Sequence, residues 1–191
     1  TVLLAVFIFS PKPANAIQSD TEQFIQKMEI LKREIAMLKM LVSNFLSEKE
    51  ILYPSFLAIN LSDNSVALEK DSSRQYPIAS ITKLMTAVIS LENIKDSQKI
   101  AINKEMLKPY GSSPAIYNGL EIKAEDLIKA SLIQSANDAS EALAQFFGKE
   151  KFLGLMNKKA KELGMVNTEF SDVYGLSPKN QSNAKDMAKL L

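Results

Sequence analysis

The sequence predicts a mixed α/β (α+β) chain in which a short strand hairpin precedes a set of helices. Two apolar runs, Ser55 to Leu61 and Ser65 to Glu69, are joined by the polar turn formers Ser62 to Asn64, which is typical of a hairpin. From Ser80 onward, apolar residues recur at helical spacing, and glycines follow several of the runs. Strands followed by a run of helices favour an α+β arrangement.

The 191 residues divide into three predicted parts, 1–18, 19–50 and 51–191. Residues 2–9 are wholly apolar, and the small-x-small sequence Ala14 to Ala16 follows them, as at the end of a secretory signal peptide. An uncleaved membrane anchor or a frayed hydrophobic N-terminus would give the same pattern. A signal or an anchor predicts an exported protein, located in the periplasm, at the outer face of the cytoplasmic membrane or in the cell wall.

Residues 19–50 contain no glycine or proline and carry a heptad seam over about three heptads. The seam consists of Phe24, Met28, Leu31, Ile35, Leu38, Val42 and Phe45. This pattern predicts a coiled-coil stalk or a dimer through residues 24–45. Apolar residues off the seam, such as Ile25 and Ile30, equally fit an amphipathic helix packed on its own domain. The sequence leaves these two alternatives open.

Helical spacing predicts four helices in residues 51–191. They run from Ser80 to Asn93, from Ala124 to Phe147, from Phe152 to Leu163, and onward from Ala184. In the first, the predicted apolar face consists of Ile81, Leu84, Met85, Val88 and Leu91. The segments 111–119 and 173–183 are rich in turn-forming residues and predict loops.

Composition excludes several classes of chemistry. The chain has no cysteine and no histidine, which excludes disulfides, thiol nucleophiles, Ser-His-Asp triads and histidine-based zinc sites. Its net charge of +1 lacks the basic excess of nucleic-acid binders, so no nucleic-acid partner is expected. Nucleophilic chemistry would therefore use Ser, Thr or Lys, with Lys, Asp or Glu as base, and no metal or other cofactor is expected.

The pattern Ser-x-x-Lys occurs twice, at Ser80/Lys83 and at Ser182/Lys185. Chance gives about as many in this composition, so the spacing alone also fits an N-cap serine and a solvated lysine. Ser80 begins a predicted helix, where backbone N–H groups and the dipole stabilise a developing oxyanion. The i, i+3 spacing lets Lys83 reach Ser80. A lysine acts as a base only when burial or a nearby cation lowers its pKa.

A second polar element interrupts the apolar helix predicted over Ala124 to Phe147. Ser135 and Asn137 would be costly there if they were buried without partners. Facing a cleft, Ser135 could relay a proton and Asn137 could donate to a substrate amide. The alternatives are local helix bonding or a turn between two shorter helices. A similar triplet, Ser62 to Asn64, falls in the predicted hairpin turn and is interpreted as turn chemistry only.

Residues Tyr76 to Ala87 closely resemble the nucleophile segment of the D-alanyl-D-alanine carboxypeptidases, the low-molecular-mass penicillin-binding proteins of serine peptidase family S11. The resemblance continues in order over residues 53–191. Its further segments are Phe56 to Glu69, Gly111 to Ser113, Glu125 to Leu127, Gln134 to Ala139, Leu163 to Met165, Tyr174 to Leu176 and Asp186 to Ala188. The resemblance implies a β-lactamase/transpeptidase-like fold, an antiparallel sheet with flanking helices and a helical subdomain, with the site between them.

By this resemblance, Ser80 is the acyl-ester nucleophile, Lys83 the proton acceptor, Ser135 the proton relay and Asn137 a substrate-binding residue. The implied reaction removes terminal D-alanine from peptidoglycan stem peptides ending in D-Ala-D-Ala, with β-lactam antibiotics as inhibitors. The alternatives are a D,D-endopeptidase, a β-lactamase-related enzyme, which Ser-Ala-Asn in place of Ser-Asp-Asn disfavours, and a non-catalytic coiled-coil cell-wall protein.

The resemblance also defines what the 191 residues lack. The third element of the family, Lys-Thr-Gly on a sheet strand, is absent and is expected beyond Leu191. Because the sequence starts at Thr1 and stops inside a predicted helix, we expect a C-terminally truncated fragment that is inactive by itself. The helix over residues 19–50 is not a usual part of the family.

Overall fold

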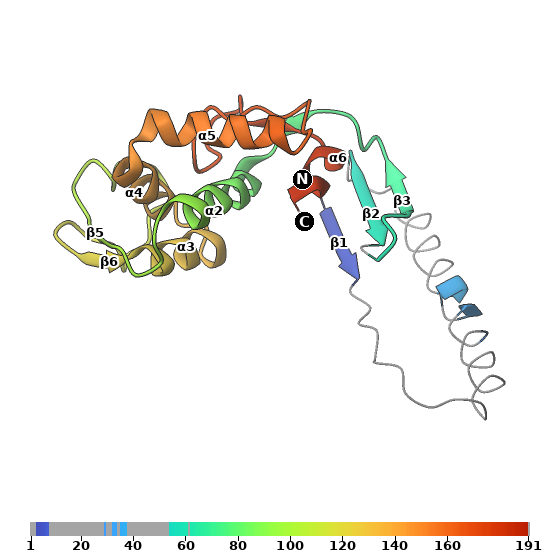
Figure 1. The fold of residues 1–191 in the computed structure, drawn as a ribbon, viewed down its shortest axis with the longest axis horizontal. Helices are drawn as coiled ribbons and strands as arrows, with labels where there is room; N and C mark the ends of the chain where they lie inside the picture. The colour runs from blue at the N-terminus through green and yellow to red at the C-terminus, as the bar shows by residue number, and fades with distance from the viewer. Residues whose placement is uncertain are drawn as a thin grey trace.

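The computed structural model describes residues 3–7, 29, 32–33, 35–37, 54–60 and 62–190. Within them, a small sheet lies at one end and a group of packed helices at the other (Figure 1), which confirms the mixed α/β class. The strands are β1 (Leu3–Phe7), β2 (Phe56–Asn60), β3 (Val66–Lys70), β4 (Tyr76–Pro77), β5 (Lys99–Ala101), β6 (Glu121–Lys123) and β7 (Gln181–Ser182). The helices are η1 (Ala79–Ile81), α2 (Thr82–Asn93), α3 (Ala124–Ile133), α4 (Asn137–Phe147), α5 (Lys149–Glu162), α6 (Ala184–Met187) and η2 (Ala188–Leu190).

The predicted hairpin is present as the antiparallel pair β2–β3. Its turn places Asn64 at a φ of +56°, and the Asp63 carboxylate accepts a hydrogen bond from the Ser65 N–H at 2.9 Å. Asparagine and aspartate are favoured in such turns because their side chains bond to nearby backbone. β1 pairs with β2 in parallel, so the sheet β1-β2-β3 contains a parallel pairing that the sequence did not predict.

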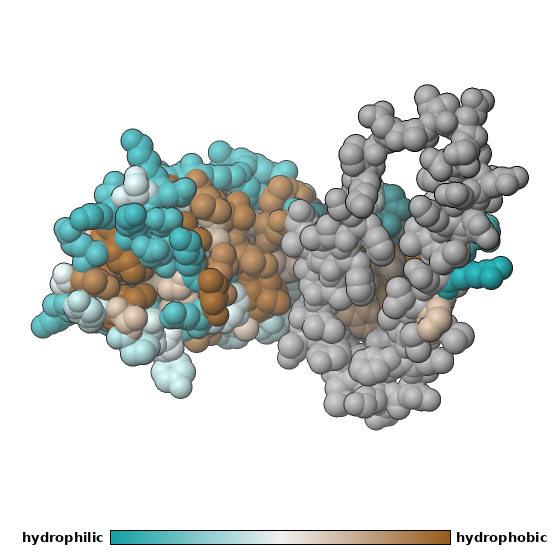
Figure 2. Space-filling model, turned by 90° about the horizontal axis from the view of Figure 1, so that it is seen from below, coloured by the Kyte–Doolittle hydropathy of each residue, from teal (hydrophilic) through white to brown (hydrophobic). Residues whose placement is uncertain are grey.

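Helices α2 to α5 enclose the main core. α2 packs on α3, α4 and α5, while α4 also packs on α3 and α5. Met85, Leu127, Leu143, Phe152 and Met156 are fully buried between them. Burying side chains of this size stabilises a fold by about 2 kcal/mol each. Apolar residues also reach the surface of the helical part, as Figure 2 shows in brown. The core fixes the first turns of α2 and α4 relative to one another.

The buried face of α2 differs from the predicted apolar face. Leu84 and Leu91 are 38% and 59% exposed, whereas Lys83 and Thr86 are buried. On this side α2 packs against the irregular segment 172–180 as well as against other helices. The Thr86 hydroxyl, for example, donates to the Val173 carbonyl at 2.6 Å. Buried polar groups require partners of this kind, and a loop supplies backbone acceptors that a packed helix withholds.

The prediction of a single helix over Ala124 to Phe147 is wrong, because this region forms two helices. α3 ends at Ile133 and α4 begins at Asn137, and between them Ser135 has a φ of +55°. A left-handed residue cannot continue a right-handed helix. The alternative interpretation, a turn between two shorter helices, is therefore confirmed.

The short pair β4–β7 joins two segments that are distant in sequence. β7 lies in the region predicted as a loop over residues 173–183. Immediately after β4, the Ile78 N–H donates to the Asn180 carbonyl at 3.0 Å. This pairing brings the chain that precedes Ser80 against residues 171–182.

The predicted heptad helix falls mostly outside the described residues. Of residues 24–45, the structure describes 29, 32–33 and 35–37, which are helical and exposed. Lys32 there donates to Glu29 across one helical turn at 3.3 Å. The coiled coil, the dimer through residues 24–45 and the signal peptide or anchor over residues 1–18 stay predictions. Within the described part of the chain, no helix has the length and apolar character needed to cross a bilayer.

Candidate active site

Ser80 lies in the 3-10 turn η1, directly before α2, rather than inside the α-helix. The preceding residue, Ala79, has a φ of +46°, a conformation that persists only where the surroundings impose it. Gly175 packs against this turn, and a Cβ atom there would lie 1.9 Å from the Ala79 carbonyl oxygen. The close approach therefore excludes any side chain at Gly175 and holds the turn that presents Ser80.

Ser80, Lys83 and Ser135 form a closed hydrogen-bonded triangle. The Lys83 Nζ atom lies 3.2 Å from Ser80 Oγ and 3.2 Å from Ser135 Oγ, and the two Oγ atoms are 2.9 Å apart. Lys83 Nζ also donates to the Tyr174 carbonyl at 2.8 Å. A lysine ammonium has three N–H donors, so these three oxygen atoms satisfy all of them.

Lys83 is unusual because a long charged side chain is only 2% exposed. Burial disfavours the ammonium form and lowers the pKa of Lys83 to about 8, although the Asp172 carboxylate partly opposes this by raising it. With that pKa, roughly a tenth of the side chains are neutral at pH 7. The neutral amine has a lone pair and can accept the proton of the Ser80 hydroxyl.

The turn between α3 and α4 brings Ser135 to the triangle. The Ala136 N–H donates to the Ala130 carbonyl at 3.2 Å and closes the end of α3. The Ser113 hydroxyl donates to the side-chain oxygen of Gln134 at 3.0 Å. These bonds fix both neighbours of Ser135, so its left-handed backbone and the direction of its hydroxyl are set by tertiary contacts.

Asn137, the fourth predicted site residue, begins α4 and is 7% exposed. Its side-chain amide donates to the Tyr110 carbonyl, and its backbone N–H donates to the Gly111 carbonyl at 3.0 Å. Its side-chain oxygen is buried without a hydrogen-bond partner among the described residues. Asn137 thus holds the loop at 110–111 through its two donors. Its side-chain oxygen remains able to accept a hydrogen bond.

Sequence reasoning assigned no role to Tyr174, which contacts Lys83, or to Asp172 and Asn180, which hold the turn around Tyr174. The Asp172 carboxylate accepts from the N–H groups of Tyr174 and Gly175, and the Asn180 amide donates to Thr82 Oγ1 at 2.9 Å. One sequence pattern could have drawn attention to this turn. Asp172 and Gly175 have the Asp-x-x-Gly spacing that is typical of a turn stabilised by a side chain. It does not reveal what the turn contacts.

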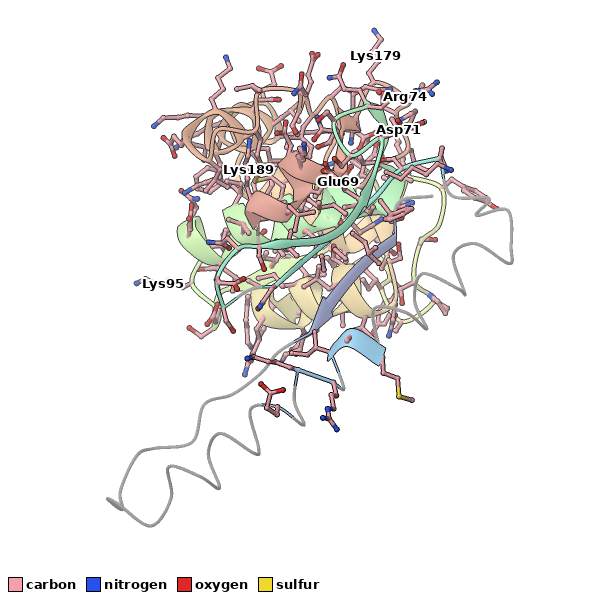
Figure 3. The ribbon with its side chains drawn as sticks, turned by 90° about the vertical axis from the view of Figure 1, so that its right-hand side faces the viewer. Glu69, Asp71, Arg74, Lys95, Lys179 and Lys189 are labelled. Carbon is pink, nitrogen blue, oxygen red and sulfur yellow. The ribbon has the colours of Figure 1, made fainter. Side chains whose placement is uncertain are left out.

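The second Ser-x-x-Lys pair has other partners. Ser182 Oγ bonds to Thr168 Oγ1 at 2.7 Å, and Lys185 Nζ lies 3.3 Å from a carboxylate oxygen of Glu69. Figure 3 shows Glu69 beside the C-terminal helical segment. Lys185 therefore ties helix α6 to strand β3, whereas Ser182 contacts the segment around Thr168.

The triangle combines a hydroxyl nucleophile, a desolvated amine and a second hydroxyl that contacts both. Such a set can form and resolve a covalent ester on Ser80 by proton transfer alone. Within the described residues, no group of three or more His, Cys, Asp or Glu side chains is placed to hold a metal ion.

Known proteins share this region. The D-alanyl-D-alanine carboxypeptidase family (peptidase S11) matches residues 42–191. The D-alanyl-D-alanine endopeptidase of Haemophilus influenzae is 38% identical over 143 residues, which cover 73% of this chain and 49% of the relative. The D-alanyl-D-alanine carboxypeptidase DacF of Bacillus subtilis is 36% identical over 142 residues, which cover 70% and 36%. The crystal structure of the D-alanyl-D-alanine carboxypeptidase DacD from Francisella tularensis matches with a TM-score of 0.69 and 29% identity, covering 74% and 36%.

The chain spans about half the length of the Haemophilus influenzae relative and a smaller share of the other two proteins. The matched segment contains the whole triangle, and the structural match confirms the penicillin-binding, transpeptidase-like fold that the sequence predicted. This chain belongs to the D-alanyl-D-alanine carboxypeptidase family.

Proposed function

We propose that the protein carrying this chain is a serine-type D-Ala-D-Ala carboxypeptidase that removes terminal D-alanine from peptidoglycan stem peptides. The observation that carries the proposal is the triangle of Ser80, Lys83 and Ser135 around a buried amine. It lies within the residues that match a family described by this activity. Because the relatives are longer, the activity is proposed for the whole protein.

In the proposed acylation, Ser80 Oγ attacks the carbonyl carbon of the penultimate D-Ala while Lys83 Nζ accepts the hydroxyl proton. Collapse of the tetrahedral intermediate breaks the bond to the nitrogen of the terminal D-Ala. That nitrogen takes up the proton from Lys83 through Ser135, whose hydroxyl contacts Lys83 Nζ and Ser80 Oγ. The step yields an ester on Ser80, free D-alanine and a neutral Lys83.

In the proposed deacylation, a water molecule attacks the ester carbonyl and gives its proton to Lys83. The Ser80 oxygen leaves and recovers a proton from Lys83, which restores the starting state. α2 begins at Thr82, two residues after Ser80, so the positive end of its dipole favours the oxyanion of both intermediates. The Asn137 side chain would orient the substrate amide beside the ester.

A D,D-endopeptidase that cleaves peptidoglycan cross-links is the second candidate. The relative that is 38% identical is named an endopeptidase, whereas the one at 36% is named a carboxypeptidase. Both reactions pass through the same Ser80 ester. They differ in the amine that leaves, which is free D-alanine in one case and belongs to a second stem peptide in the other.

Labelling with a fluorescent penicillin tests both candidates, because a β-lactam would acylate Ser80 as the substrate does. The full-length protein should become labelled, Ser80→Ala should remove the label, and the matched variant Ser182→Ala should keep it. No label on the wild-type protein, or a label that survives in Ser80→Ala, would exclude both candidates. Release of D-alanine from a pentapeptide, compared with cleavage of a cross-linked dimer, then separates them.

Two finer features of the proposal come from the sequence pattern. Residues 1–18 would export the protein or anchor it at the outer face of the membrane, and residues 24–45 would form a dimer. Cell fractionation tests the first. Sedimentation of the full-length protein tests the second, because Ile35→Glu on the seam should convert a dimer to a monomer. A monomeric wild-type protein would contradict the dimer.

A further inference from the structure

The turn beside Lys83 is built around one carboxylate. Asp172 Oδ1 accepts from the Tyr174 N–H at 3.0 Å and from the Gly175 N–H at 2.5 Å, and Oδ2 accepts from the Ser177 N–H at 2.5 Å. Asp172 is only 9% exposed. A carboxylate that bonds three backbone N–H groups fixes the path of those residues, because removing it would leave buried donors unpaired. The direction of the Tyr174 carbonyl therefore depends on Asp172.

The same turn is attached to the nucleophile segment at two further points. Asn180 is fully buried, and its amide donates both to Asp172 Oδ1 at 3.1 Å and to Thr82 Oγ1 at 2.9 Å. Gly175 contacts the carbonyl of Ala79 without room for a side chain. Ala79 and Thr82 lie on either side of Ser80. The two contacts therefore fix the position of the 172–177 turn relative to Ser80.

The Tyr174 carbonyl has a specific consequence for the Lys83 amine. A carbonyl oxygen only accepts hydrogen bonds. The Tyr174 carbonyl therefore accepts from one Lys83 N–H group, at 2.8 Å, whether the amine is protonated or neutral. A neutral amine keeps two N–H groups and one lone pair. With one N–H on Tyr174 and the other on Ser135 Oγ, the lone pair is directed at the Ser80 hydroxyl.

We propose that Asp172 is a positioning residue for Lys83: it holds the Tyr174 carbonyl that orients the amine, and it places a negative charge beside that amine. This inference rests on the proposed function, in which Lys83 is the base for Ser80. The two effects are separable. Orientation sets how fast the neutral amine takes the proton, while the charge sets the pH range in which the amine is neutral.

The groups that face Lys83 make Asp172 the charge to test. Around the amine itself are the hydroxyls of Ser80 and Ser135 and the carbonyl of Tyr174, none of which is charged. Asp172 is the charged group that acts on Lys83, and it raises the lysine pKa. On the neighbouring helices, Lys149 of α5 lies over the ring of Tyr174 and is paired with Glu141 of α4 at 2.7 Å. The opposite charges of that pair offset each other.

The experiment measures the rate at which a fluorescent penicillin acylates Ser80 in the full-length protein, between about pH 5 and pH 10. The rate should rise with pH to a plateau as Lys83 becomes neutral, and the midpoint of the rise reports its titration. A wild-type protein that is not labelled excludes the proposed function and this inference with it. A labelled wild type lets the inference be judged separately.

Asp172→Asn keeps the size of the side chain and removes its charge. Because the ammonium form of Lys83 loses a stabilising neighbour, we expect the midpoint to move to lower pH by about half a unit or more. The plateau rate should fall by about tenfold, because Asn cannot accept from all three N–H groups and the amine is less well held. An unchanged midpoint overturns the inference even if the plateau falls. A loosened turn alone could lower the plateau, but only the loss of the Asp172 charge should move the pH at which Lys83 titrates.

Three further variants separate charge from structure. Thr82→Val removes the bond to Asn180 without changing any charge, so it should lower the plateau and leave the midpoint in place. Asp96→Asn makes the same charge change at an exposed residue and should alter neither. If Asp172→Asn does not fold, Asp172→Ser provides a second neutral side chain, whose hydroxyl can accept from the turn, and the same midpoint shift is expected. A midpoint that stays at the wild-type value in this variant also overturns the inference.

Discussion

The two Ser-x-x-Lys pairs of this chain have the same spacing and opposite surroundings. Lys83 is 2% exposed, and its amine bonds to residues 52 and 91 positions away in the sequence. The Lys185 side chain is 48% exposed and lies against the Glu69 carboxylate on the surface. A base must lose its proton to act, and the burial of Lys83 among neutral oxygens favours that loss. The environment of each lysine therefore depends on its tertiary partners and not on the spacing.

The largest expected difference between the pairs is in acylation. Lys83→Ala should slow penicillin acylation of the full-length protein by about a thousandfold, within the range for loss of a general base. Lys185→Ala should leave the rate unchanged within about twofold, because its ion pair is exposed. Rates of labelling under identical conditions measure both. Comparable losses in the two variants would show that the buried environment does not distinguish the pairs.

The contact between Gly175 and Ala79 shapes the turn that carries Ser80. Gly175→Ala should destabilise the protein by about 3 kcal/mol or more and abolish labelling, because the new Cβ would overlap the Ala79 carbonyl. At Gly119, with a φ of +89°, a Cβ atom would meet no other described atom within 4 Å. The control Gly119→Ala should therefore lose only about 1 kcal/mol and keep its label. Urea unfolding and labelling test both, and equal losses would refute the role of the contact.

The pH dependence of acylation should depend on Lys83 and not on Lys185. Burial lowers the pKa of Lys83 to about 8, so the neutral amine, the proposed base, is abundant above that pH and scarce below it. The acylation rate should therefore fall by about tenfold for each pH unit below 8 and level off above it. Lys185→Ala should show the same profile. A rate that stays constant between about pH 6 and pH 8 would argue against Lys83 as the base.

The smallest effect is expected in the hairpin, where the second Ser-x-Asn triplet lies. Asn64 has a φ of +56°, close to the value of +55° at Ser135, but its turn is held by local bonds. Asn64→Ala should lower the free energy of unfolding by about 1 kcal/mol, because alanine tolerates this conformation less well. Acylation should not change, whereas Asn137→Ala should reduce it. A loss of acylation in Asn64→Ala would mean that the hairpin contributes to the site.

The sequence predicted those parts of the fold that depend on neighbouring residues. The hairpin, α5 and the start of α6 at Ala184 follow from turn formers, periodicity and glycine. The spacing of Ser80 and Lys83 also predicted their contact correctly, because i, i+3 residues share a helix face.

The rest depended on contacts between distant segments. The sequence left the break at Ser135 as one of several alternatives, because bonds from distant residues such as Ser113 help to hold that turn. The polar buried face of α2 follows from its packing against the 172–180 segment, which no pattern within α2 reveals. Asp172 was missed for the same reason, since its importance comes from the residues that its turn contacts.

The assembly of the triangle from three separate segments also has a consequence during biosynthesis. Residues 83, 135 and 174 are far apart along the chain, and closing such long loops is slow relative to forming helices. Until they meet, the Lys83 amine is hydrated and stays protonated at neutral pH. Under the proposed function, the newly made or unfolded polypeptide thus carries no activated serine, and Ser80 becomes reactive only after these segments have met.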